Sequence, residues 1–160
     1  MQIYTNNFQP DYTNLLEVLH NRRPKRLPLY EHIIDVEFIS NMLEKELLPQ
    51  SNNPIDLEAF YADLTGFWKD MTYDAFAYEA AICEILPDHG AINGGRPGPI
   101  QNRCDFERYP FDEIPQIFWE TYTPHLEAIK KVLPPGMKAY GGCGYGIFET
   151  SEDLVGYEYL

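Results

Sequence analysis

The feature that most constrains this chain is the stretch from residue 137 to residue 156, which reads as a strand, a glycine-rich turn and the start of a helix. The apolar run from Met137 to Tyr140 suits a buried strand, and Thr150 and Asp153 have capping-box spacing at a helix start. The glycines between them are Gly141, Gly142, Gly144 and Gly146. Glycine spacing alone favours a tight structural turn. Its position after a strand leaves a binding loop open, because α/β proteins gather their chemistry at that end of the strands.

The preceding chain repeats this alternation of strands and helices. Apolar side chains at helical spacing predict helices at about 13–21, 35–48, 56–71 and 111–132, the first beginning near Asn14 and the third at Asp56. Apolar runs predict strands at 27–30 and 73–78. Pro124 predicts a break or kink in the last of these helices. The alternation indicates an α/β fold with a parallel sheet built from βα units.

Three other segments have the composition of irregular structure. Residues 1–10 and 49–53 are polar and predict an N-terminal arm and a linker. Residues 88–110 are rich in glycine and proline and predict a long loop, a kind of segment that often forms a lid or a binding wall in compact domains.

The charge of the chain argues against two classes of partner. The chain has 160 residues and a net charge of −13, from 25 acidic and 12 basic side chains. Nucleic acids and anionic membranes both require clustered Lys and Arg, so neither is expected as a partner. The one basic cluster, from Arg22 to Arg26, is interpreted as charge at a helix end followed by a solvated turn.

The cysteines and the absence of targeting patterns predict a cytoplasmic protein. No signal-peptide pattern is visible, and no apolar run approaches the roughly 20 residues of a membrane span. Cys83, Cys104 and Cys143 form no CxxC pair, which predicts reduced thiols and no structural zinc site. Cys143 is expected to be a small buried thiol, and His125 a residue of a helix surface.

Three stretches together resemble the uroporphyrinogen decarboxylase family, whose members fold as (β/α)8 barrels. They are the short helix leading into Leu27-Pro28-Leu29-Tyr30, the run from Tyr73 to Glu79, and residues 138–156. Their order matches the first three strands of the family along nearly all of the chain. The resemblance implies a partial (β/α)8 TIM-type barrel over residues 1–160, with about the first three strands and their helices. Because a barrel needs about 250 residues, we expect an N-terminal portion of a longer protein, or completion by a second chain or a homo-oligomer.

The resemblance implies one of two parent reactions, decarboxylation of uroporphyrinogen or corrinoid-dependent methyl transfer. The true decarboxylases carry two arginines after the first strand that hold the carboxylates of the tetrapyrrole, whereas residues 31–35 contain no arginine. This departure favours the methyltransferase-like branch, in which zinc activates a thiol and a corrinoid is the partner. The zinc ligands of that branch lie on later strands, so no metal ligand is assigned in this chain.

The candidate site residues would lie at the barrel mouth and would contact a small-molecule substrate. Glu79 and His32 are the candidate catalytic residues, and Glu31, Gly144 and Tyr145 are the candidate substrate-binding residues. A carboxylate after a strand can donate a proton or orient a cationic group, or it can simply cap the next helix. His32 could shuttle a proton or be an ordinary hydrogen-bonded histidine.

Two non-catalytic alternatives stay open. The chain could be an inactive, truncated half-barrel, which would have exposed sheet edges that favour association. It could also be a small α/β binding module unrelated to the barrel, which would fold alone as a stable monomer.

Overall fold

The computed structural model describes residues 7–47 and 53–160, which form two compact units. One unit consists of the chain up to Tyr78 together with Pro124–Tyr140, and the other consists of Glu79–Thr123 and Gly141–Leu160. The expected N-terminal arm and the expected linker at 49–53 lie largely outside the described residues.

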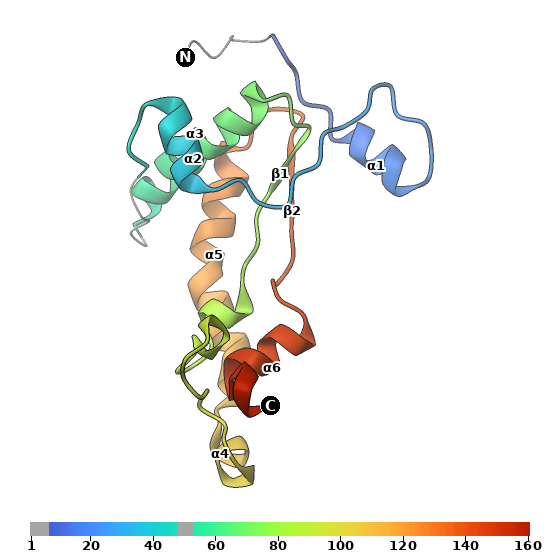
Figure 1. Ribbon diagram of the computed structural model, residues 1–160. Helices are drawn as coiled ribbons and strands as arrows, with labels where there is room; N and C mark the ends of the chain where they lie inside the picture. The colour runs from blue at the N-terminus through green and yellow to red at the C-terminus, as the bar shows by residue number, and fades with distance from the viewer. Residues whose placement is uncertain (1–6, 48–52) are drawn as a thin grey trace. The chain divides into compact units, whose positions relative to one another are not determined.

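Among the described residues, three helices precede the first strand, and the second strand lies between two further helices (Figure 1). The α-helices are α1 (Thr13–Leu19), α2 (Val36–Leu43), α3 (Pro54–Asp70), α4 (Arg103–Arg108), α5 (Ile114–Val132) and α6 (Ile147–Val155). The strands are β1 (Ala75–Ala77) and β2 (Lys138–Tyr140), and short 3-10 turns occur at Ile82–Glu84, Ala91–Asn93, Phe111–Glu113 and Tyr157–Tyr159. The predicted α/β class is therefore confirmed. Pro124 does not break the helix, since α5 continues through this proline, so the break is excluded and the predicted kink stays a prediction.

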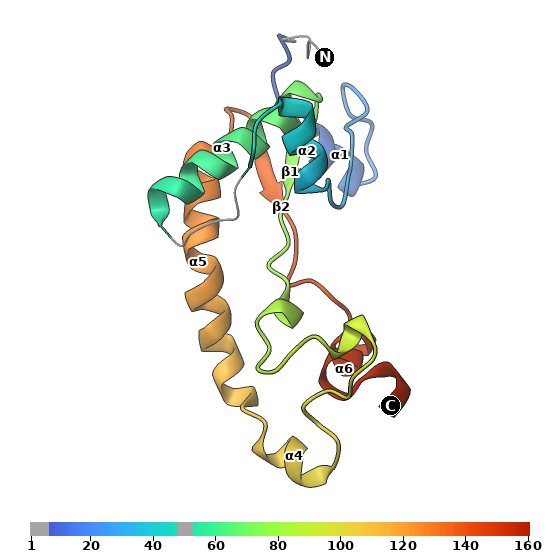
Figure 2. The same cartoon turned by 60° about the vertical axis from the view of Figure 1, so that its left-hand side comes forward.

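The two strands lie side by side as a parallel pair (Figures 1 and 2). Phe76 of β1 is opposite Ala139 of β2, and the amide of Tyr78 extends the ladder by donating to the Tyr140 carbonyl at 2.9 Å. Helix α5 lies between the strands in the chain, as parallel pairing requires. Within residues 7–47 and 53–160 each strand pairs only with the other, so each has one edge without a strand.

The predicted strand at 27–30 is wrong. These residues form neither strand nor helix, and Leu27 and Leu29 are exposed rather than buried. A strand needs a neighbour to satisfy its backbone groups, and Pro28 has no N–H to contribute to a ladder. The segment has the apolar residues of a strand, but within residues 7–47 and 53–160 no strand pairs with it.

Two helices begin ahead of the residues that the sequence suggested. At α3 the side chain of Asn53 accepts a hydrogen bond from the Ile55 amide at 3.1 Å, and Pro54 occupies the first turn, where its missing N–H has no cost. At α1 the Asp11 carboxylate accepts from the Thr13 amide at 3.1 Å, while Asn14 is buried and donates to the Asp11 carbonyl.

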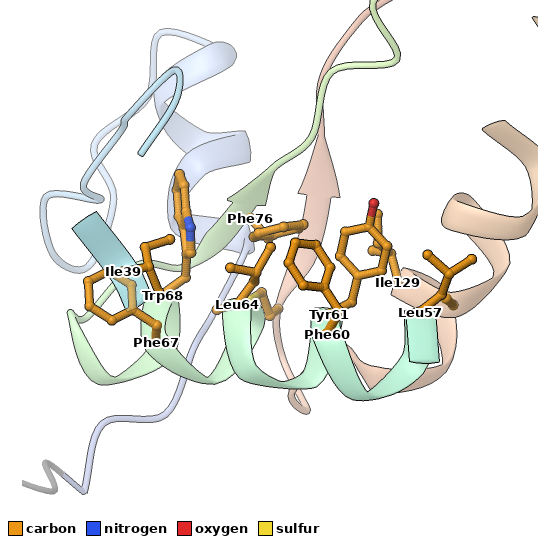
Figure 3. Close-up of a cluster of buried hydrophobic side chains, with 11 residues drawn as sticks. Ile39, Leu57, Phe60, Tyr61, Leu64, Phe67, Trp68, Phe76 and Ile129 are labelled. Carbon is orange, nitrogen blue, oxygen red and sulfur yellow. The ribbon is translucent and has the colours of Figure 1, made fainter. Parts of the chain in front are cut away.

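The core of the first unit is the aromatic face of α3 (Figure 3). Side chains spaced at helical intervals along α3 project toward Phe76 of β1 and Ile129 of α5. They are Leu57, Phe60, Tyr61, Leu64, Phe67 and Trp68. The predicted interpretation of this stripe as core is confirmed, and burial of these side chains fixes α3 against the strand pair.

Arg26 has a structural role that the sequence interpretation missed. Its guanidinium forms two hydrogen bonds with the fully buried carboxylate of Asp74, which also accepts from the Asp11 amide at 2.6 Å. The guanidinium carbon lies 4.4 Å from the centre of the Phe8 ring. The basic cluster at 22–26 is therefore not simply a solvated turn, because its last member ties the N-terminal segment to the start of β1.

His125 is buried, so its expected position on a helix surface is wrong. Its Nδ1 lies 2.8 Å from the Tyr61 hydroxyl, and its ring stacks on Tyr78 at 6.3 Å between ring centres. Burial lowers the pKa of His125 from its ordinary value of 6.5, because the apolar surroundings disfavour the charged ring.

We predict that the first unit loses stability as the pH falls below about 6.5. In the folded unit the His125 pKa is lowered, so the unfolded chain takes up a proton first and stability falls through the folded pKa. Urea denaturation between pH 7.5 and pH 5 tests this, and His125→Gln is expected to have a flatter pH profile. His89→Gln alters an exposed histidine and serves as the control. If the stability of His125→Gln falls with pH as steeply as that of the unaltered chain, His125 is not the group responsible.

The second unit is organised by α6. Asp153, fully buried on this helix, accepts hydrogen bonds from the amides of Gly90 at 2.7 Å and Ile92 at 3.1 Å. Leu154 packs with Cys83, and its carbonyl accepts from the Ile100 amide. The predicted loop at 88–110 therefore follows α6 closely, and it includes α4 and the turn at Ala91–Asn93.

Candidate functional site

The glycine-rich loop after β2 is held against the segment that follows β1. The amide of Ala80 donates to the Gly142 carbonyl at 3.0 Å, and the amide of Ile82 donates to the Cys143 carbonyl at 2.9 Å. The Tyr122 hydroxyl donates to the Ala81 carbonyl at 2.7 Å. These hydrogen bonds fix the backbone of both segments, and they therefore fix the positions from which the side chains of the loop project.

Gly144 is needed for the close approach of these two segments. Its φ is +70°, a conformation that residues with a side chain rarely adopt. A Cβ at this position would lie 2.9 Å from the Ala81 Cα, which is too close for two carbon atoms. The local structure thus supports the turn interpretation of the glycine, and it does not by itself identify a ligand.

We predict that Gly144→Ala destabilises the second unit by about 1–3 kcal/mol, because a strained backbone and a backbone clash act together. The matched control is Gly142→Ala, since Gly142 has no positive φ and its nearest neighbour to an added Cβ is 3.9 Å away. Urea denaturation monitored by Trp119 fluorescence, in a Trp68→Phe background, measures both variants. Equal stability of the two alanine variants would show that the close approach to Ala81 is not needed.

Helix α6 begins directly after the loop. The Gly146 amide donates to the Glu149 carboxylate at 2.7 Å. This is one of the two hydrogen bonds of a capping box; the other needs a side chain at the cap position, which glycine lacks. The predicted capping pair of Thr150 and Asp153 is wrong, since the helix starts three residues earlier and Asp153 is a buried acceptor instead.

Tyr145 lies between the loop glycines and is partly exposed. Partial burial raises the pKa of its hydroxyl, and the nearby carboxylates of Glu84 and Glu149 raise it further. Tyr145 therefore keeps its proton at neutral pH and can donate a hydrogen bond to a ligand at the loop.

Glu79 is the first residue of the second unit and is half-buried. It follows β1 with Tyr78 between them, and it precedes Ala80, whose amide donates to the Gly142 carbonyl of the glycine loop. The backbone thus places Glu79, Gly144 and Tyr145 on two bonded segments of one unit. A carboxylate and a phenol on such segments could act together on a small polar group.

Glu31 and His32 belong to the first unit, and both are exposed. The His32 amide lies 3.1 Å from the Glu31 carboxylate, and the Glu31 carbonyl accepts a hydrogen bond of 2.5 Å from the Tyr140 hydroxyl. That tyrosine also stacks on Tyr30, and burial raises its pKa to about 12. The expectation that these two residues follow a strand is wrong, because residues 27–30 form none.

The cysteines are free thiols, as expected. Cys83 is buried beside Thr150, and burial raises its pKa, so it is a poor nucleophile at neutral pH. The expectation of a buried Cys143 is wrong, because this residue is exposed on the glycine loop.

Sequence reasoning missed the buried carboxylate of Asp153. Its Oδ1 accepts two amide hydrogen bonds from the turn at 90–92, and its Oδ2 is buried without a hydrogen-bond partner in the structure. The one signal at Asp153 in the sequence is its capping-box spacing with Thr150. That spacing predicts a residue of a helix start rather than a buried hydrogen-bond acceptor.

The described part of the chain contains no group of three or more His, Cys, Asp or Glu side chains arranged to hold a metal ion. In the same residues, no helix combines the length and apolar character needed to cross a bilayer. Comparison of the chain with protein-family models, with curated proteins and with solved structures finds no match.

Proposed function

We propose that the chain is the first part of a (β/α)8 barrel of the uroporphyrinogen decarboxylase family, acting in the cytoplasm on a small-molecule substrate. The observation that carries the proposal is the parallel pair of β1 and β2, joined through α5. One strand leads into Glu79 and the other into the glycine-rich loop. Barrel enzymes place their chemistry in the loops that follow the strands.

Corrinoid-dependent methyl transfer is the parent reaction we favour over decarboxylation of uroporphyrinogen. The substrate of the decarboxylation carries many carboxylates and needs cationic partners. Residues 31–35 contain no arginine, and the segments 79–95 and 141–160, which hold Glu79 and Tyr145, contain no lysine or arginine. An acidic environment of this kind suits a neutral or cationic substrate better than a polyanion.

In this proposal Glu79 donates a proton or orients the substrate, and Gly144 and Tyr145 contact it, the last through its hydroxyl. His32 as a proton relay and Glu31 as a substrate contact keep the roles expected from the sequence, and both belong to the first unit. No set of residues in the described part of the chain fits the zinc ion of the methyltransferase branch. Its ligands would have to come from other strands of the barrel, and no step is assigned to the metal here.

The proposal is tested by adding the missing strands. The chain is mixed with a separately expressed polypeptide that carries the strands of a methyltransferase-branch barrel that the chain lacks, and two activities are measured. We expect methyl transfer from methylcobalamin to a small thiol, and no release of carbon dioxide from uroporphyrinogen. Glu79→Gln is expected to lower the rate by about 10²-fold, as loss of a group that takes up a proton in the reaction does, here the proton released by the thiol. The control is Glu158→Gln, an exposed carboxylate in the same unit.

Three results would count against this proposal. Carbon dioxide release without methyl transfer would assign the decarboxylase branch instead. Assembly of the two polypeptides without either activity would support the inactive half-barrel. Failure to assemble, with the chain a stable monomer, would support the small binding module.

A further inference from the structure

The start of α6 exposes a group of apolar side chains. Ile147 is 90% exposed and Phe148 is 61% exposed, and Tyr145, just ahead of the helix, is 43% exposed. The buried residues of this helix are Asp153 and Leu154, which pack within the second unit. The exposed group, Tyr145, Ile147 and Phe148, is here termed the α6 apolar surface. Large side chains exposed together in this way mark interaction sites.

The surroundings of the α6 apolar surface are acidic. The segments 79–95 and 141–160 contain no lysine or arginine. The basic residues of the second unit are Arg96, Arg103 and Arg108. Arg103 pairs with Glu107 at 2.7 Å, and Arg96 donates to the His89 carbonyl. Glu149 follows Phe148 on α6 and its carboxylate accepts from the Gly146 amide at 2.7 Å, while Glu84 adjoins Cys83, whose sulfur lies 3.7 Å from the Thr150 hydroxyl of the same helix.

We infer that the α6 apolar surface docks a basic amphipathic helix of a partner protein. Apolar side chains of such a helix would cover Ile147 and Phe148, while its lysines or arginines would face Glu84 and Glu149. A second copy of this chain would bring the same carboxylates against one another, and an anionic membrane would be repelled. The inference uses only residues of the second unit and goes beyond the barrel proposal.

The test uses a synthetic helical peptide with leucine on one face and lysine on the other. Its matched control has glutamate in place of every lysine. Binding to the 160-residue chain is measured by fluorescence anisotropy at low and at physiological salt. We expect the lysine peptide to bind at least about tenfold more tightly than the glutamate peptide, and to weaken as salt rises.

Variants of the chain locate the binding surface. Ile147→Ser with Phe148→Ser is expected to weaken binding at least about tenfold, and Glu84→Gln about twofold to threefold. Ile55→Ser, which alters a 76%-exposed isoleucine of the other unit, should leave binding unchanged. Circular dichroism checks that each variant is folded, and Glu84→Gln tests the surface without altering its apolar side chains.

Three results would overturn the inference. Equal binding of the lysine and glutamate peptides would show that charge does not select the partner. Unchanged binding in both the double serine variant and Glu84→Gln would place the peptide elsewhere. A dimer of the chain that the double serine variant dissociates would make a second copy the occupant.

Discussion

Trp68→Ala is expected to destabilise the first unit by about 3–5 kcal/mol, the range for removing a large aromatic side chain from a packed core. The indole is 2% exposed, and its ring centre lies 4.6 Å from that of Tyr73 and 5.5 Å from that of Phe76. Its loss would leave a cavity between α3 and β1, where the surrounding rings cannot all move inward. Urea denaturation followed by circular dichroism measures the loss.

The chain contains its own control for this variant. Trp119 is 59% exposed, so Trp119→Ala is expected to change stability by less than about 0.5 kcal/mol. The chemical change is the same in both variants, while the two sites differ in burial and in the unit to which they belong. If the two alanine variants are equally stable, the aromatic face of α3 is not the core of the first unit.

Arg26→Met is expected to cost about 3 kcal/mol, because it leaves the buried Asp74 carboxylate without its cationic partner. The guanidinium is partly exposed, which keeps the expected loss at the lower end for buried pairs. The Asp74 carboxylate retains the Asp11 amide as a donor, but one amide cannot replace a two-bond guanidinium contact. Trp68 fluorescence in urea, in a Trp119→Phe background, follows this unit alone.

Two further variants separate the ion pair from general effects of charge. Arg23→Met removes an exposed cation of the same cluster and is expected to be nearly neutral. Arg26→Met combined with Asp74→Leu removes both charges, and we expect it to be more stable than Arg26→Met alone. A double variant that is less stable than Arg26→Met would contradict a penalty from an unpaired buried carboxylate.

The sequence predicted the structure best where the regular spacing of apolar residues coincides with the side chains that are buried. The apolar stripe of α3 and the apolar runs around Phe76 and Ala139 predicted the helix, both strands and their parallel pairing. The run at 27–30 has the same local pattern, yet it forms no strand. Strand formation depends on a neighbouring strand, and local composition cannot supply that information.

The position of the glycine-rich loop was predicted, but its contacts were not. The position of the glycine loop after β2 follows from the local pattern, whereas its bonds to Ala80 and Ile82 depend on the tertiary fold. The buried state of His125 and Asp153 depends on which elements pack against them. The sequence around a single polar residue does not show which elements will pack against it. The surface position expected for His125 and the capping role expected for Asp153 were therefore wrong.

The central claim is that the strand pair belongs to a larger barrel, and amide hydrogen exchange of β2 tests it most directly. The rate is measured for residues 137–140 of the chain alone, and again after mixing with the polypeptide that carries the remaining strands of the barrel. We predict weak protection alone, because β2 has one strand neighbour in the described structure, and strong protection after mixing. Strong protection in a monomer, unchanged by the added strands, would contradict the barrel and identify an autonomous domain.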